Sequence, residues 1–464
     1  MAAAPTALIL AAGQGTRMRS ATPKLLHDVL GRPLVAWPIA AARAAGCERI
    51  VAVVSPDDAL GDVLGDAQRV VQPRSDGTGG AVRAASDVIA DAEEVLVLSG
   101  DVPLLDAGTI EQILHTHRSR RAAATIVTMT LDDPGYYGRV VRDSVGDVQR
   151  VAEAKEAGDA TPRELAIREV NAGTYVFNGA ALIGVLGQLR NDNAQGEYYL
   201  PDALPLLLRS GKTVAAHALD DPELQLGVNT QVDLSEVNAV ARRRVLEAHM
   251  LTGVRIVDPA STWIDVDVAI EPDARIEPGT VLAGQTSVGR NSVIGPHSTL
   301  RDARIGSGVQ IPHSYLTSCR VADGATVGPF AYLRPDTSLR EKAKAGAFVE
   351  IKNSVIGPEA KVPHLSYIGD TDVGQGANLG AGTITANYDG QRKHRTRIGD
   401  GVRTGVDTAL VAPVSLGDHA YTGAGSVIDT DVPEGALGIA RSRQKNVEGY
   451  AERRVTRAEE EDRR

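Results

Sequence analysis

A glycine-containing turn near the N-terminus carries residue types suited to phosphate chemistry. It spans Leu10–Met18, follows an apolar run, and is followed by a second cation at Lys24. Gly13 and Gly15 allow close approach to the backbone, so that N–H groups can face phosphate oxygens. Arg17 and Lys24 would neutralise a triphosphate and the charge that develops at its α-phosphorus. The turn is neither a Walker loop nor a dinucleotide fingerprint, and an ordinary surface turn is the alternative.

A carboxylate at the end of an apolar run adds a candidate metal ligand. Asp101 directly follows the run 95–100, which predicts a buried strand. Open α/β sheets bind ligands at the carboxyl ends of their strands. Mg²⁺ is usually held by one or two protein oxygens, with phosphates and water as its other ligands. Asp101 therefore fits a magnesium ligand, although a lone Asp could also cap the strand end.

A second group of polar residues interrupts a repeating pattern in the C-terminal half. Arg334 and Lys352 supply two cations, His364 supplies a titratable base, and the stretch 378–390 is rich in glycine. This set suits acyl transfer from a thioester to the amine of a sugar phosphate. The pKa of His suits removal of the amine proton near neutral pH, and a backbone N–H near Ala381 could stabilise the oxyanion. A lone loop histidine is the alternative.

The N-terminal motifs resemble the signature of the sugar-1-phosphate nucleotidylyltransferases, Leu-x-x-Gly-x-Gly-Thr-Arg-Met followed by Pro-Lys. Gly-Asp-Val-Pro around Asp101 and Gly-Val-Asn ending at Asn229 match as well. The resemblance implies attack of a sugar phosphate on the α-phosphorus of UTP, with Arg17 and Lys24 as catalytic residues and Mg²⁺ held by Asp101 and Asn229. It assigns nucleotide and sugar contacts to Leu10, Ala11, Ala12, Gly13, Lys24, Gln72, Gly77, Thr78, Ser99, Gly100, Asp101, Gly138, Glu153, Asn171 and Asn229.

The two halves together resemble the family of bifunctional bacterial N-acetylglucosamine-1-phosphate uridyltransferases / glucosamine-1-phosphate N-acetyltransferases, over about residues 6–450. The resemblance implies that His364 accepts a proton, and that Arg334, Lys352, Tyr367 and Asn378 hold glucosamine-1-phosphate. It assigns acetyl-CoA contacts to Ala381, Asn387, Tyr388, Val406, Ala424 and Arg441. It also implies a homotrimer through a left-handed β-helix. The acetylated product, N-acetylglucosamine-1-phosphate, would feed the first half, which makes UDP-N-acetylglucosamine for peptidoglycan and cell-wall synthesis.

Three positions depart from this family pattern. Val406 replaces the serine of Gly-Ser-Asp-Thr. A hydroxyl contact to CoA would then be missing, at a cost of about 1 kcal/mol. Thr230 follows Gly-Val-Asn where the family has Asn or Asp, and Tyr136 replaces the first glycine of Gly-Tyr-Gly-Arg. Neither of these two changes removes a residue with an assigned role.

Apolar runs that alternate with helical stretches predict an α/β Rossmann-like nucleotidyltransferase domain over residues 1–228. The predicted strands are 7–10, 50–54, 95–99, 125–130 and 175–177, and the predicted helices are 36–45, 79–89 and 109–118. This alternation indicates a mostly parallel sheet that is covered on both faces. Residues 229–253 predict a linker helix, because apolar residues there recur three or four positions apart.

Over residues 254–449 the period changes to six, beginning with Ile264, Ile270, Ile276 and Leu282. A period of six predicts a parallel β-helix, with the aliphatic residue inside and glycine or small polar residues at the corners. The low aromatic content of 3 % agrees with a narrow interior. Interruptions near 340–355 and 386–397 predict loops that leave the coil. The charged stretch 450–464 predicts a solvated, disordered tail.

Charge and cysteine content limit the partners. A formal net charge of −10 argues against a protein that coats nucleic acid or binds anionic membranes. No apolar run reaches the ~18 residues of a membrane span. The two cysteines, Cys47 and Cys319, lie too far apart in sequence to suggest a disulfide framework, which predicts a cytoplasmic protein.

Three functions fit these observations. The first is the bifunctional enzyme, and the second is a sugar-1-phosphate nucleotidylyltransferase whose β-helix is only an oligomerisation scaffold. Release of CoA thiol in the presence of glucosamine-1-phosphate separates these two. The third is a non-catalytic assembly subunit, which predicts loss of the charged positions. That reading is disfavoured because Arg17, Lys24, Asp101, Asn229 and His364 are all present.

Overall fold

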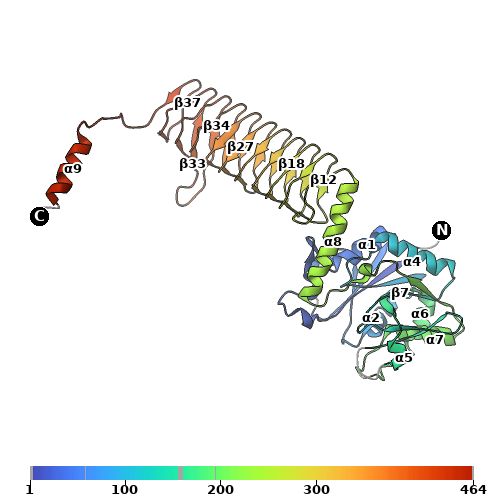
Figure 1. Ribbon diagram of the computed structural model, residues 1–464. Coiled ribbons are helices and arrows are strands. Elements are labelled where there is room, and N and C mark those ends of the chain that lie inside the picture. Colours follow the sequence, from blue (N-terminus) through green and yellow to red (C-terminus); the bar gives the residue numbers. More distant parts are fainter. Residues whose placement is uncertain (1–3, 58, 155–159, 194, 462–464) are drawn as a thin grey trace. The chain divides into compact units, whose positions relative to one another are not determined.

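The computed structural model describes residues 4–57, 59–154, 160–193 and 195–461. By its internal contacts the chain divides into two compact units, Met1–Glu247 and Ala248–Arg464. Within the described residues, none of the helices combines the length and apolar character needed to span a bilayer. Figure 1 shows an α/β unit and a stack of short strands.

The first unit contains a nine-stranded mixed sheet whose main path runs β11-β7-β10-β6-β1-β4-β5. These strands are β1 (Thr6–Ala11), β4 (Arg49–Val54), β5 (Gln68–Val71), β6 (Glu94–Ser99), β7 (Ala124–Thr130), β10 (Glu169–Asn178) and β11 (Val214–Ala218), with β8 (Arg139–Arg142) and β9 (Val148–Ala152) beside β10. Only β10 runs antiparallel to its neighbours on the main path, β6 and β7. The prediction of a mostly parallel sheet is therefore confirmed, and all five predicted strands are present.

Helices cover both faces of this sheet. One face packs against α1 (Ala36–Ala44) and α4 (Ala107–Ser119), and the other against α2 (Thr78–Ala84), α3 (Ser86–Ile89), α6 (Gly179–Leu186) and α7 (Ala203–Arg209), while the short α5 (Pro162–Leu165) contacts β8. Along β1, Ala7 and Ile9 belong to the first core and Leu8 to the second, and all three are fully buried. Burial on both faces explains why these strands are continuous apolar runs. The predicted helix 79–89 is present as two helices, α2 and α3.

The predicted linker is a single helix, α8 (Gln231–Leu251). At its start, Asp233 accepts a hydrogen bond from the Thr230 backbone N–H at 2.9 Å, and the Thr230 hydroxyl accepts one from the Asp233 N–H at 3.2 Å. This reciprocal pair satisfies two N–H groups that a helix start leaves free. Gly253 ends the helix in the left-handed region, at φ 96°.

The second unit is a three-faced parallel β-helix. Its faces are sheets of seven strands from β12 (Arg255–Ile256) to β30 (Lys361–His364), ten strands from β13 (Trp263–Ile264) to β38 (Val427–Ile428), and nine strands from β14 (Ala269–Ile270) to β36 (Val414–Leu416). Ile276 pairs with Ile294, eighteen residues later, and both side chains are fully buried. Three strands of six-residue period thus complete each coil, which confirms the predicted repeat.

The predicted loop at 340–355 is wrong. This stretch continues the coil as β27 (Lys344–Ala347) and β28 (Glu350–Lys352). The inward position of β27 is held by Ala345, which pairs with Val327 below it and Val362 above it. The small side chain broke the aliphatic pattern without breaking the coil.

The other predicted interruption is confirmed. Residues 387–395 leave the coil between β33 (Ile384–Ala386) and β34 (Thr396–Ile398), and the resulting loop projects near β33 in Figure 1.

The predicted disorder of the tail is wrong, because Tyr450–Glu461 form helix α9. This segment contains strong helix formers and no glycine or proline. Its described side chains are exposed, as predicted, and residues 462–464 of the tail lie outside the described part.

Candidate active sites

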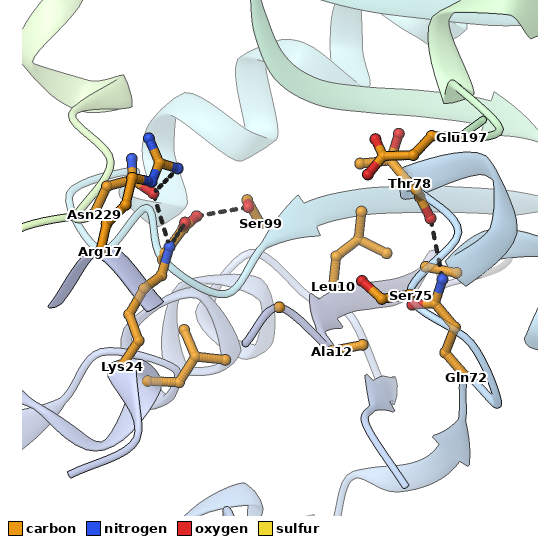
Figure 2. A pocket seen from close by; sticks show the side chains of 15 residues that line it. Leu10, Ala12, Arg17, Lys24, Gln72, Ser75, Thr78, Ser99, Glu197 and Asn229 are labelled. Atoms are coloured by element: carbon orange, nitrogen blue, oxygen red, sulfur yellow. Dashed lines mark hydrogen bonds and ion pairs between the residues drawn. The ribbon is translucent and has the colours of Figure 1, made fainter. Parts of the chain in front are cut away.

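A cavity of about 390 Å³ lies at the carboxyl ends of β1 and β6, where a parallel sheet binds ligands. It collects predicted residues that are far apart in sequence: Leu10, Ala12, Gly13, Arg17, Lys24, Gln72, Gly77, Thr78, Ser99, Asp101 and Asn229. Figure 2 shows two polar groups, one around Lys24 and one around Gln72, with Leu10 between them. The cavity therefore has room and polar groups at both ends for an elongated nucleotide.

The first polar group is organised around the Lys24 ammonium. Lys24 forms an ion pair with Asp101 and donates a hydrogen bond to Asn229 Oδ1 at 3.1 Å. Arg17 donates to the same Asn229 oxygen at 2.8 Å, and the Ser99 hydroxyl donates to Asp101 at 2.7 Å. The side chains of Lys24 and Asp101 are only 10 % and 21 % exposed. The structure thus brings together the catalytic and metal-binding residues that were predicted for the N-terminal half, Arg17, Lys24, Asp101 and Asn229.

Local backbone geometry explains why these side chains meet. Gly15 has φ 62°, and a Cβ at this position would collide with the Cβ of Lys24. A residue without a side chain is therefore needed for the turn to fold over Lys24. On the far side, the Asn229 N–H is held by Asp233 of α8 at 2.8 Å. The start of α8 thereby fixes the residue that meets Arg17.

The second polar group holds the loop between β5 and α2. Gln72 is buried, and its amide donates to Asp76 at 2.7 Å and to the Gly77 carbonyl at 3.2 Å. The Thr78 hydroxyl accepts a hydrogen bond from the Leu200 N–H at 3.1 Å. Sequence reasoning did not single out other lining residues, among them Leu25, Ser75 and Ala81. Ala81 lies in α2, and Leu25 and Ser75 lie in the segments before and after the nearby strands, and their residue types carry no signal of a binding site.

A second cavity of about 250 Å³ adjoins the first, because Leu10, Thr78 and Glu197 line both. Its walls include the three predicted sugar-binding residues, Gly138, Glu153 and Asn171. The backbone N–H of Asn171 donates to the Gly138 carbonyl at 2.8 Å, which ties two of them together. The structure therefore places the predicted sugar contacts next to the nucleotide cavity.

Tyr175 also lines the second cavity and was missed by sequence reasoning. The residue is 3 % exposed. Burial raises the pKa of the Tyr175 hydroxyl, so it stays protonated. A tyrosine inside a strand looks like a core residue in the sequence, and no motif distinguished it.

The donor set around Lys24 fits a divalent cation. Among the described residues, no group of three or more His, Cys, Asp or Glu side chains could hold a metal alone. The oxygens of Asp101 and Asn229 nevertheless both contact Lys24 Nζ, so they converge on one cationic position. One carboxylate and one amide oxygen are a set that Mg²⁺ accepts when phosphates and water complete its shell.

The β-helix places His364 at the base of a column. His364 is exposed at the end of β30, and its carbonyl accepts a hydrogen bond from the residue after Ala381. In the same way, the Ala381 carbonyl accepts a hydrogen bond from the backbone N–H of the residue after Val406. The Val406 carbonyl accepts one from the residue after Ala424. Three of the predicted acetyl-CoA contacts therefore lie above His364 on successive coils. Within the described chain, the His364 imidazole has no hydrogen bond or ion pair.

Other predicted residues of this half lie on the ten-stranded face. Arg334 follows β25 (Tyr332–Leu333), Lys352 ends β28, and Tyr367 begins β31 (Tyr367–Gly369). Arg334 donates to Glu350 at 2.9 Å, and Glu350 pairs in register with Tyr367. Glu350 is a partner that sequence reasoning missed, because the stretch that contains it was predicted to be a loop.

The remaining predicted contacts are spread over both regions. Asn378 bridges to Lys361 and Arg403 on the seven-stranded side, in the same coil as Ala381. Asn387 is buried beside Asp370, and Tyr388 is exposed on the projecting loop, where its hydroxyl donates to the Gly390 carbonyl at 2.6 Å. Arg441 is exposed beyond the last strand. Among the described residues, no hydrogen bond or ion pair joins His364 to Lys352 or Arg334.

Comparisons with known proteins match both units. The MobA-like NTP transferase domain matches residues 7–170, and the bacterial transferase hexapeptide family (six repeats) matches residues 267–302. This second match and the three-faced coil identify the second unit as a left-handed parallel β-helix of hexapeptide repeats.

Curated relatives extend the similarity to nearly the whole chain. The bifunctional protein GlmU of Mycobacterium tuberculosis is 47 % identical over 458 residues, which cover 96 % of this chain and 92 % of that protein. The protein of the same name from Mycolicibacterium gilvum is 47 % identical, with 96 % and 91 % coverage. That of Brevibacillus brevis is 46 % identical, with 96 % coverage of both chains.

Proposed function

The chain belongs to the family of bifunctional GlmU proteins, and on that premise we propose that its two units catalyse consecutive steps of UDP-N-acetylglucosamine synthesis. The β-helix transfers an acetyl group from acetyl-CoA to glucosamine-1-phosphate. The α/β unit then transfers a uridylyl group from UTP to N-acetylglucosamine-1-phosphate and releases pyrophosphate. The observation that carries the proposal is the convergence of Arg17, Lys24, Asp101 and Asn229 at one end of a nucleotide-sized cavity.

In the α/β unit, catalysis comes mainly from positioning and charge neutralisation, as is usual in phosphoryl chemistry. Gly13 faces open space, so its backbone can approach the triphosphate. Arg17 and Lys24 stabilise the charge that develops on the α-phosphate. Mg²⁺ held by Asp101 and Asn229 would supply further charge neutralisation of the triphosphate. The adjoining cavity with Glu153 and Asn171 orients the sugar phosphate toward the nucleotide.

In the β-helix, His364 accepts the proton that the amine loses as it attacks the thioester. The exposed imidazole without a protein partner suits this role, because a base must reach the substrate proton directly. The column of Ala381, Val406 and Ala424 offers small or apolar side chains along which a long, thin acyl carrier can lie. Arg334 and Lys352 supply the charge that binds the phosphate of the acceptor.

We further propose that the site is completed by a second subunit of a homotrimer. A hexapeptide β-helix is consistent with oligomerisation, and the exposed His364 is joined by no hydrogen bond or ion pair to Arg334 or Lys352 of its own described chain. An acetyl site between copies would bring His364 of one chain to the cations of another. We place the protein in the cytoplasm, because both cysteines are free and buried.

One coupled assay tests the proposed function. The purified protein is given acetyl-CoA, glucosamine-1-phosphate, UTP and Mg²⁺, and each component is then omitted in turn. We expect UDP-N-acetylglucosamine only from the complete mixture. When N-acetylglucosamine-1-phosphate replaces glucosamine-1-phosphate, acetyl-CoA becomes dispensable. Uridylyl transfer without release of CoA thiol would leave the β-helix as a scaffold and contradict the bifunctional assignment.

A further inference from the structure

A buried carboxylate joins three successive coils of the β-helix beside the predicted acetyl site. Asp370 is 5 % exposed and occupies a corner of the coil. Its Oδ1 accepts a hydrogen bond from the Asn353 amide at 2.5 Å, and its Oδ2 accepts one from the Asn387 amide. Lys352 Nζ lies 3.7 Å from the same Oδ2. Asp370 thus contacts Asn353 of the coil below, Asn387 of the coil above, and the ammonium of Lys352.

The charges around Asp370 show why a carboxylate is needed there. Burial opposes its ionisation, but the two asparagine hydrogen bonds and the charges of Lys352 and Lys393 outweigh that effect, so the pKa of Asp370 lies below its ordinary value. Lys393, on the projecting loop, has its pKa lowered by the hydrogen bond and charge of Lys352. Two ammonium groups therefore lie close enough to repel each other, and the Asp370 carboxylate offsets that repulsion.

We propose that Asp370 is a positioning residue for acetyl transfer. It holds Lys352 and Asn387 in one fixed arrangement, so that the cation for the sugar phosphate and a contact for acetyl-CoA are in place before the substrates bind. Its oxygens are occupied by two amides, and it is buried, so it acts through these neighbours. The inference rests on the proposed acetyltransferase function and extends it to a residue that no motif indicated.

Asp370 can affect phosphate binding in two ways: it can repel the phosphate by its charge, or it can hold Lys352 in place for the phosphate. A carboxylate near a phosphate site disfavours the phosphate by charge alone, so Asp370 would weaken binding if it served no other purpose. Long lysine side chains, however, lose much rotamer freedom when they are held in one place. A residue that pre-orders Lys352 removes this loss from the binding step. The two effects predict opposite outcomes for an Asp370 variant.

The substitution Asp370→Asn tests this inference with little risk to the fold. Asn353 occupies the same corner one coil earlier with φ 44°, so asparagine is compatible with this backbone. The matched control is Asp336→Asn, because Asp336 lies at the same corner two coils earlier, has φ 63°, and is exposed. Both variants make the same chemical change. Only Asp370→Asn removes the buried charge.

Acetyl transfer is followed by thiol release while glucosamine-1-phosphate is varied. We expect kcat/KM of Asp370→Asn to fall about 10- to 100-fold, as when a residue that orients a metal ligand is lost, and mainly through a higher KM. Asp336→Asn should change it less than twofold, and uridylyl transfer should be unchanged in both. An unchanged or lower KM in Asp370→Asn would mean that charge repulsion dominates, and would overturn the proposal.

The same substitution in a Lys352→Ala protein shows whether Asp370 acts by positioning Lys352 or only by stabilising the fold. In a Lys352→Ala protein, Asp370→Asn should reduce kcat/KM for glucosamine-1-phosphate less than threefold, because the neighbour of Asp370 that binds the sugar phosphate is gone and only Asn387, a contact for acetyl-CoA, is still held. A loss of equal size in both backgrounds would assign Asp370 a purely structural role and contradict the proposal. Wild-type protein without acetyl transfer would contradict the proposed function itself. Normal wild-type transfer with an unaffected Asp370→Asn variant would contradict this inference alone.

Discussion

The ammonium of Lys24 and the carboxylate of Asp101 form an ion pair where β1 and β6 end, although 77 positions separate them in sequence. The two strands are parallel neighbours, so their carboxyl ends meet at one edge of the sheet. Asn229 joins the pair through the same ammonium. This edge therefore presents one negative charge and one amide oxygen to a cation, with two basic side chains for the phosphates.

Removal of the negative charge at Asp101 should disable uridylyl transfer and leave acetyl transfer unchanged. We expect Asp101→Asn to lower kcat/KM for UTP about 10²- to 10³-fold, as when one preorganised electrostatic contact is lost. The variant should also need more Mg²⁺ for half-maximal rate, because an amide replaces the carboxylate ligand. Pyrophosphate release at increasing Mg²⁺ measures both effects. Acetyl transfer in the same preparation serves as the control, and parallel loss of both activities would contradict separate sites.

A hydroxyl at position 406 should strengthen acetyl-CoA binding. Val406 is half exposed and stands above Ala381 in the column that begins at His364. We expect Val406→Ser to lower the KM for acetyl-CoA about fivefold, which corresponds to one hydrogen bond of about 1 kcal/mol. Val411→Ser, an exposed valine outside this column, is the matched control. Equal KM values for Val406→Ser and wild type would remove position 406 from the CoA contacts.

Buried histidines should make the α/β unit less stable in mild acid. Burial lowers the pKa of His117, whose Nδ1 lies 2.9 Å from the Thr125 hydroxyl, and burial also lowers that of His217. Since the unfolded chain then binds more protons near pH 6.5, the stabilisation is present above that pH and is lost as the pH falls below it.

Thermal unfolding at several pH values between 7.5 and 5.5 measures this loss. The helical signal in circular dichroism reports the unfolding of the α/β unit. We expect the melting temperature to fall with pH in wild type and to fall less in His117→Gln, which does not titrate. His115→Gln changes an exposed histidine of the same helix and should behave as wild type. A decline as steep in His117→Gln as in wild type would show that His117 does not contribute.

Much of the architecture could be predicted from the sequence because its signals are local. Runs that are apolar on both faces predict strands under two helical layers, and a period of six predicts the coil. The place of Asp101 followed from the rule that open α/β sheets bind ligands at the carboxyl ends of their strands, whereas its ion pair with Lys24 was not predicted. Ala345 shows where such reasoning fails, since a small inward residue interrupts the pattern while the coil continues.

The neighbours of Asp370 could not be predicted for a different reason. In a β-helix, contacts between coils depend on how many residues each coil contains. Lys361 bridges to Asn378, seventeen positions on, but Asn378 bridges to Arg403, twenty-five positions on, because the projecting loop intervenes. Asn387 lies seventeen positions after Asp370 but begins that loop, so spacing alone did not show whether it still lies above Asp370. Tyr175 was missed because a buried strand tyrosine has no signal that separates a cavity wall from a core.

Reciprocal inactivation tests most directly whether one chain holds two independent active sites. Arg17→Ala and His364→Ala are assayed separately for pyrophosphate release and for thiol release, with Arg19→Ala as an exposed control for the first. We predict that Arg17→Ala lowers the rate of uridylyl transfer at least 100-fold. Acetyl transfer should be kept, because the Arg17 side chain acts only at the nucleotide cavity. His364→Ala should lose acetyl transfer and keep uridylyl transfer. Loss of both activities in either folded variant, or full retention of both, would contradict the account.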